Sequence, residues 1–197
     1  MSSLSTSPPA RRPRAPRVDA ARNRVALLDA ARDAFSDDDA DASLEAIARA
    51  AGVGIGTLYR NFPTREDLVA AVYATELDAV IAAADPLLRT KSPDQALRAW
   101  TDRYAAFVAT KRGMAESLRA GALVGAAAAN HTRERVNSVI GAFLAAGTET
   151  GVFRTDVQAD DVTTALVGFF LATRDSPDPA QTSRLLDLLI DGLHPRP

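Results

Sequence analysis

The stretch SLEAIARAAGVGIGTLYRNFPTREDL, residues 43–68, predicts two short helices joined by a tight glycine turn and followed by a third helix. Ser43 precedes the first apolar repeat and can cap that helix through its hydroxyl. Gly52 follows the repeat, at the position where a left-handed residue would end the helix. Pro63 stops the second helix, and Thr64 caps the third. Helix, glycine turn, helix is the sequence pattern of a helix-turn-helix.

The second helix of this motif, about residues 55–62, has one apolar face and one exposed face of unusual composition. Leu58 and Phe62 stand four residues apart and therefore share the buried side. Gly54 and Gly56 are poor helix formers, which a helix that had only to be stable would avoid. They are explained if the backbone must approach another surface closely. The face opposite Leu58 carries Gly56, Thr57 and Arg60, and Ile55 and Tyr59 flank it.

The run GVGIGTLYRNFPTREDL, residues 52–68, closely resembles the TetR/AcrR family of transcriptional regulators, and the resemblance is dense over residues 25–73. It implies that the helix after the turn lies in the major groove of double-stranded DNA. Beyond residue 73, only length, helicity and helix order agree with the family. The resemblance also implies a homodimer that binds a palindromic operator and is released from it by a small molecule.

Side-chain chemistry and the resemblance together indicate which residues contact DNA. Thr57 can reach a base edge or a phosphate, and Arg60 can read guanine through a bidentate pair or bind the backbone. Tyr59 would present its hydroxyl to a phosphate, unless it is half-buried. Ile55 fits either an apolar contact with DNA or the buried stripe. The predicted DNA-binding residues are Ser43, Ile55, Gly56, Thr57, Tyr59, Arg60, Asn61 and Arg65.

Composition limits the class of protein further. Of the 197 residues, 47% are hydrophobic and 6% aromatic, and helical periods recur throughout, which predicts an all-α fold with an ample core. The absence of cysteine excludes disulfides, and with two histidines we expect no metal site and no cofactor. No apolar run reaches 18 residues, and no apolar segment follows the basic N-terminus. We therefore expect a cytoplasmic protein without a membrane span.

Charge is distributed unevenly along the chain. The net charge is −2, yet residues 1–24 carry six arginines against Asp19, a net charge of +5, so the remaining residues carry −7. Residues 1–19 are predicted to be a disordered basic arm. Such an arm can be a solubilising tail, but beside a helix-turn-helix we favour an arm that binds the minor groove or phosphates.

Helical periods along the chain predict about nine helices in two parts. We expect a three-helix DNA-binding domain over residues 20–66 and a larger helical domain for ligand binding and dimerisation over residues 67–197. Pro86 should end the helix that begins near residue 65, and residues 152–160 read as a polar connection. The short turn at residues 175–179 makes the last two helices antiparallel neighbours. The other helices are predicted at about residues 20–35, 93–112, 113–123 and 132–148.

An aromatic stripe in the second half of the chain fits two interpretations. Trp100, Tyr104 and Phe107 recur at helical spacing, which is typical of a packed core. Ligand cavities are also lined mostly by apolar side chains, and the family resemblance makes a cavity an equal alternative. The candidate ligand-binding residues are Trp100, Arg103, Tyr104, Phe107, Met114, Leu118 and Phe143.

The last helix is too apolar for a helix with one exposed face. Its leucines and Ile190 cover more than one side, and the part not packed on the chain's own core would be an exposed patch in a monomer. We therefore predict that the last two helices form the dimer interface. The predicted interface residues are Leu166, Phe169, Phe170, Leu185, Leu186, Leu189 and Leu193.

The sequence contains no arrangement of residues typical of a catalytic site. It has no G-x-S-x-G, P-loop or H-E-x-x-H motif, so we do not predict an enzyme. The predicted function is a TetR-like, ligand-responsive repressor. The alternative is a helical small-molecule-binding protein or enzyme without DNA activity, which the acidic body would suit. A third interpretation is a regulator that acts by dimerisation alone, without a ligand.

Overall fold

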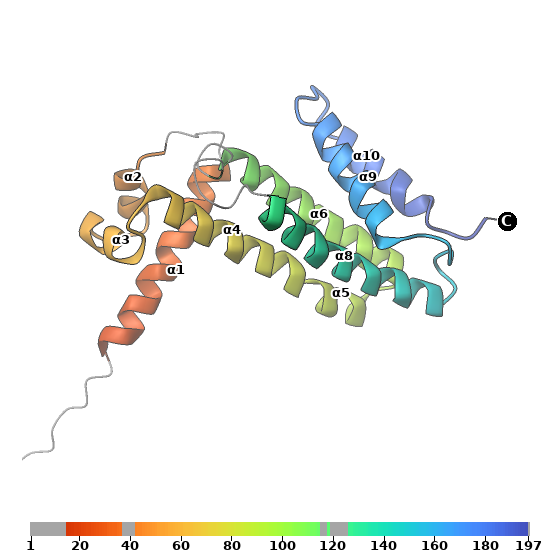
Figure 1. Cartoon of the computed structure of the whole chain (residues 1–197), viewed down its shortest axis with the longest axis horizontal. Helices are drawn as coiled ribbons and strands as arrows, with labels where there is room; N and C mark the ends of the chain where they lie inside the picture. The colour runs from red at the N-terminus through yellow and green to blue at the C-terminus, as the bar shows by residue number, and fades with distance from the viewer. Residues whose placement is uncertain (1–14, 37–41, 115–117, 119–125, 197) are drawn as a thin grey trace, which may run out of the picture.

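The computed structural model of the chain describes residues 15–36, 42–114, 118 and 126–196 (Figure 1). These residues form helices and no strand, which confirms the predicted all-α class. None of the helices described is both long and apolar enough to cross a membrane. The helices are α1 (Ala15–Ser36), α2 (Leu44–Ala50), α3 (Ile55–Asn61), α4 (Arg65–Ala82), α5 (Ala84–Thr90), α6 (Pro93–Gly113), α8 (Ala126–Glu149), α9 (Ala159–Ala172) and α10 (Gln181–Asp191).

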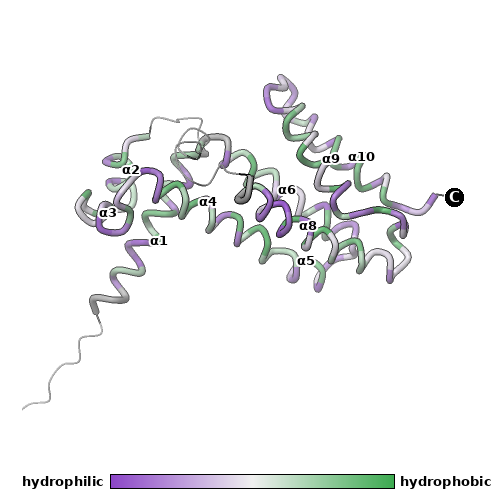
Figure 2. The backbone as a smooth tube through the Cα atoms, viewed as in Figure 1, coloured by the Kyte–Doolittle hydropathy of each residue, from purple (hydrophilic) through white to green (hydrophobic). Residues whose placement is uncertain are grey.

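The helices are arranged along an elongated molecule. A head of α1, α2 and α3 occupies one end, and the N-terminal part of α1 projects beyond it, away from the rest of the chain (Figure 1). The body consists of α5, α6, α8, α9 and α10, with α9 packed on α8 and α10 packed on α6 and α9. Hydrophobic and hydrophilic residues are mixed along α4, α6 and α8 (Figure 2).

Two hydrophobic cores lie along this length, and α4 takes part in both. Leu68 and Val72, in the first half of α4, pack in the core of the head, whereas Leu77 and Val80 pack in the core of the body. The boundary between the two cores therefore runs through a continuous helix. The largest buried side chains of the head are Phe35, Phe62, Leu27, Ile47, Leu58 and Leu68.

The helix-turn-helix forms as the local sequence predicts. Ser43 Oγ accepts a hydrogen bond from the backbone N–H of Ala46 at 3.1 Å and caps α2. Gly52 has a φ of 68°, the left-handed conformation that glycine adopts without a Cβ penalty. Thr64 and Asp67 form a reciprocal capping box that starts α4. These two helix caps and the glycine turn fix the path of the chain through α2, α3 and α4.

Two helix boundaries near prolines differ from those predicted from the sequence. α1 begins at Ala15 rather than near residue 20. Pro16 is tolerated because it falls in the first turn, where its missing N–H removes no intrahelical bond. The prediction that Pro86 ends the helix from residue 65 is wrong. The helix ends at Ala82, and Pro86 lies in the first turn of α5, where the same argument makes it tolerable. The helix predicted at residues 113–123 lies largely outside the described residues.

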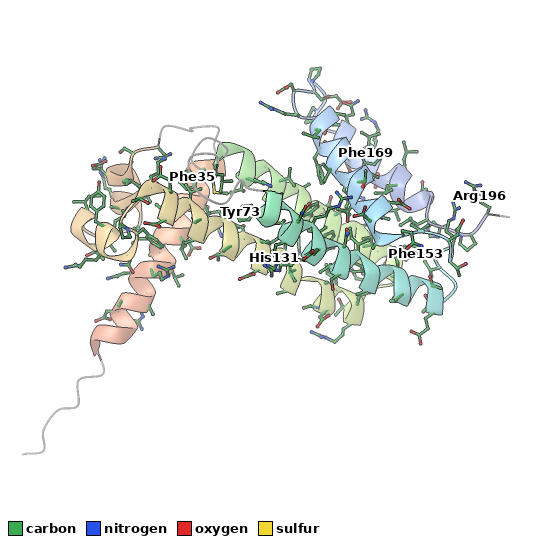
Figure 3. All side chains as sticks on the ribbon, in the orientation of Figure 1. Phe35, Tyr73, His131, Phe153, Phe169 and Arg196 are labelled. Atoms are coloured by element: carbon green, nitrogen blue, oxygen red, sulfur yellow. The ribbon has the colours of Figure 1, made fainter. Side chains whose placement is uncertain are left out.

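The connection after α8 is less polar than predicted. Gly151, at φ 73°, ends α8 as expected, but Phe153 is buried against α8. The backbone N–H of Arg154 donates to the carbonyl of Leu193 at 2.8 Å, which ties this connection to the C-terminal segment. Phe153 and Arg196 both lie at the far end of the body (Figure 3). A single phenylalanine in a polar run carries no periodicity, so the sequence pattern did not identify it as core.

Candidate nucleic-acid interface

The outer face of α3 combines exposed side chains with bare backbone. Ile55 is 37% exposed and Tyr59 is 46% exposed, while Leu58 on the opposite side is fully buried. Ile55 therefore does not belong to the buried stripe, and Tyr59 is not packed in the core. A Cβ placed on Gly54 or Gly56 would meet no atom within 4 Å, so both glycines face open space. A second molecule can approach the backbone of α3 closely at these positions.

Two polar side chains of α3 hydrogen-bond to Thr57, one to its hydroxyl and one to its backbone carbonyl. Arg60 Nη2 donates to Thr57 Oγ1 at 2.9 Å, and Asn61 Nδ2 donates to the carbonyl of Thr57 at 2.9 Å. Both contacts span a single turn of the helix. These contacts hold Arg60 and Asn61 along the surface of α3.

Two arginines join α3 and its neighbours to α1. Arg65 Nη1 donates to the carbonyl of Ala42 at 2.6 Å, and its guanidinium lies 5.4 Å from the ring centre of Phe35 in α1. Arg24 of α1 lies 4.5 Å from the ring centre of Phe62, at the end of α3. Arg65 thus has a structural role besides the predicted phosphate contact. Sequence reasoning counted Arg24 among the basic residues of the N-terminus but did not place it beside α3.

The aromatic stripe of α6 lies in the core of the body. Trp100 is fully buried, and its Nε1–H donates to the carbonyl of Val80 at 2.9 Å. Its ring stacks on Tyr104 at 5.2 Å between centroids and lies 5.9 Å from Phe143. Phe107 is also buried and stacks on Tyr104. These four aromatic residues of the predicted ligand site are therefore neighbours in space.

The other candidate ligand residues are not packed inside this aromatic cluster. Met114 and Leu118 are buried in the core of the head, not with the aromatic cluster of the body. Arg103 is exposed and lines a groove of about 370 Å³ between α1, α4 and α6, which Phe107 lines as well, together with Arg32 and Glu76. The structure therefore does not gather all seven residues around one space.

Two tyrosine hydroxyls stand at the edge of the aromatic cluster. Burial raises the pKa of Tyr104 to about 12, so its hydroxyl stays neutral at physiological pH. Within the described parts of the chain this hydroxyl makes no hydrogen bond. Tyr73 of α4, which the sequence analysis did not single out, shares a hydrogen bond of 2.8 Å with Thr132 Oγ1 of α8. Tyr73 lies where the head meets the body (Figure 3).

The predicted dimer residues divide into two groups. Leu166, Phe170, Leu186 and Leu193 are at most 7% exposed and pack within the chain's own core, which leaves little of their surface for a second copy. Phe169, Leu185 and Leu189 are half-buried. The apolar side chains that α9 and α10 expose most are not among the predicted interface residues. They are Val167, Leu171 and Leu188. Hydropathy alone does not reveal which face of a helix meets the core.

A three-helix head with an exposed α3, joined through α4 to a helical body, defines a helix-turn-helix regulator. Sequence comparison supports this class. Residues 27–72 match the family profile described as bacterial regulatory proteins, tetR family, and residues 92–195 match the C-terminal domain of SbtR-like transcriptional regulators. No curated protein matches the chain.

Solved structures agree with the sequence profiles. A TetR transcriptional regulator from Streptomyces coelicolor is 42% identical, with a TM-score of 0.79 over 88% of this chain and 99% of its own. A TetR regulatory protein from Mycobacterium vanbaalenii is 31% identical, with a TM-score of 0.73 over 91% and 99%. The protein belongs to the TetR family of bacterial transcriptional regulators, and α2 and α3 are its DNA-binding helix-turn-helix motif.

Proposed function

We propose that the protein is a ligand-responsive repressor that binds a palindromic operator as a homodimer. The observation that carries the proposal is the outer face of α3. There Ile55 and Tyr59 are exposed, and Gly54 and Gly56 leave the backbone open, while Leu58 anchors the helix in the head. An α-helix presented in this way fits the major groove of B-form DNA.

A homodimer is supported by the apolar surface of α9 and α10. Leu171 is 67% exposed and Leu188 is 64% exposed, and Val167 is exposed nearby on α9. A second copy related by a two-fold axis would bury these side chains. The same axis would present two copies of α3 about 34–36 Å apart if they enter successive major grooves, which is why a palindromic operator follows.

An effector site is supported by the cluster between α4, α6 and α8. The hydroxyl of Tyr104 has no partner in the described residues, and it borders a set of buried aromatic rings. An amphipathic small molecule with a hydrogen-bonding group would suit this chemistry. α4 packs in both cores, so a ligand that favours one tilt of α4 would favour one placement of the head. Repression would be relieved if that placement binds the operator less tightly.

Selection of genomic fragments by the purified protein at low salt tests DNA binding directly. We expect enrichment of a palindromic sequence, with binding that weakens as salt is raised. The slope of log affinity against log salt should be about −0.9 for each phosphate neutralised. The control is the same selection with Leu58→Asp, which disrupts the buried anchor of α3. If the wild-type protein enriches no sequence, the proposed function is wrong.

Tyr59→Phe should weaken binding to all DNA sequences by a similar factor. The hydroxyl is on an exposed ring, and a phosphate contact carries no information about the base. The expected loss is about 2- to 10-fold, the contribution of a typical hydrogen bond. Fluorescence anisotropy with the operator and with a scrambled duplex measures it. The matched control is Tyr73→Phe, in which the missing hydroxyl belongs to α4 and bonds Thr132 of α8. A loss confined to one base pair would contradict a phosphate role.

A further inference from the structure

We propose that Arg60 reads a guanine in each half-site of the operator, and that Thr57 is a positioning residue that acts through Arg60 rather than by touching a base. The proposal rests on the proposed DNA-binding function and gives it a specific chemistry. It distinguishes two residues for which the sequence pattern left both base and phosphate contacts open. The hydrogen bond that joins Arg60 to Thr57 supports both assignments.

The hydrogen bond between Arg60 and Thr57 fixes where the guanidinium lies. Side chains of an α-helix tilt toward its N-terminus, so a residue three positions along lies over the earlier one. The 2.9 Å contact from Arg60 Nη2 to Thr57 Oγ1 therefore draws the guanidinium back over the first half of α3. In helix-turn-helix proteins the N-terminal residues of the recognition helix face the base edges. Arg60 is thus directed toward bases rather than toward the flanking backbone.

The guanidinium keeps the donors that guanine requires. Arginine has five N–H donors in a planar fork, and Thr57 occupies one of them. In the described part of the chain Arg60 makes no ion pair and no other hydrogen bond. A bidentate pair to the O6 and N7 acceptors of guanine needs two donors, which remain available. Holding the long side chain in place before binding also reduces the conformational entropy lost on contact.

The surroundings of Arg60 favour this assignment over a backbone contact. Arg60 is the single cation within α3. Asn61 donates an amide N–H to the carbonyl of Thr57, and Ile55 contributes only an apolar side chain. The open space at Gly56 lets α3 approach the floor of the groove, where a base edge is within reach of an arginine. Thr57 is half-buried, whereas Arg60 is exposed, so Arg60 is the residue that extends from the helix.

The experiment measures base preference in single variants and in their combination. Affinities are determined for the selected operator and for each single base-pair substitution in one half-site, using the wild type, Arg60→Ala, Thr57→Val and the double variant. Arg60→Ala should lower the preference for guanine at one position by roughly 5- to 150-fold and leave the other positions unchanged. Thr57→Val, which keeps the shape but removes the acceptor, should lower the same preference by roughly 2- to 10-fold.

The double variant decides whether Thr57 acts through Arg60. We expect Thr57→Val to have no further effect on base preference once Arg60 is alanine, which is the signature of a coupled pair. Thr57→Ser, which retains the hydroxyl, should behave like the wild type. Arg60→Lys should fail to restore the guanine preference, because an ammonium cannot make the planar bidentate contact. Thermal unfolding of each variant checks that the head remains folded, as expected for changes on the outer face of α3.

Two results would overturn the proposal. If Arg60→Ala weakens all sequences equally, Arg60 contacts phosphate and no guanine is read. If Thr57→Val shifts the preference at a different base pair, or still shifts it in the Arg60→Ala background, Thr57 contacts a base itself. Both results leave the wild type selective for its operator. A wild type that shows no selectivity would instead contradict the proposed function, so the two failures are distinguishable.

Discussion

Leu171→Asp combined with Leu188→Asp should convert the protein from a dimer into a monomer and lower its operator affinity by roughly 10²- to 10⁴-fold. The expected loss is large because the second head binds intramolecularly only while the dimer holds, so avidity disappears with it. Both leucines are about two-thirds exposed, at 67% and 64%, so the substitutions do not disturb the chain's own core. A carboxylate in a dry interface remains without a partner and opposes association.

The choice of these two residues follows from burial. Phe169 and Leu189, which the sequence analysis placed in the interface, are half-buried, and a charge there would disturb packing within the chain. Sedimentation velocity at micromolar concentration measures the oligomeric state, and anisotropy measures operator affinity. Val25→Asp is the control for oligomeric state, because Val25 is 58% exposed on α1 in the head. A wild-type protein that sediments as a monomer, or a double variant that remains a dimer, would contradict the interface.

Gly147→Ala should lower the free energy of unfolding by about 3 kcal/mol. A Cβ at Gly147 would stand 2.0 Å from Cδ2 of Phe153 and 2.5 Å from its Cγ, which no van der Waals contact allows. Phe153 cannot move aside cheaply, because its ring is buried and the next residue is hydrogen-bonded to the C-terminal segment. The gain in helix propensity from glycine to alanine, about 1 kcal/mol, offsets only part of this cost.

Gly141→Ala is the matched control for the Gly147 prediction. Gly141 lies in the same helix, α8, but a Cβ there would meet nothing within 4 Å. Its replacement should leave stability unchanged or raise it by up to about 1 kcal/mol. Urea unfolding followed by circular dichroism compares the two variants. Phe153→Ala should cancel part of the added cost of Gly147→Ala, because the clash is then absent. If the two glycine variants are equally stable, the ring of Phe153 does not fill the site at Gly147.

The helix-turn-helix was determined by the sequence alone. Ser43 as a cap, Gly52 as a left-handed turn, and Leu58 and Phe62 as the buried side of α3 all follow from interactions within one or two helical turns. Such interactions depend on residue type and spacing, which the sequence states directly. The family resemblance rested on the same residues, so the fold class and the DNA-binding motif could both be predicted before any coordinates were known.

Tertiary structure alone decided which apolar residues face which neighbour. The leucines of α10 cover more than one side of the helix, and only packing on α6 and α9 buries Leu186 while leaving Leu188 exposed. In the same way, Trp100 and Met114 belong to different cores although both lie on apolar stripes. Phe153 is buried because Gly147, six residues earlier in the sequence, leaves room for its ring. The hydrophobic effect is non-directional, so a leucine is stabilised about equally against any apolar neighbour. The shapes of the packed helices then determine which neighbour it contacts.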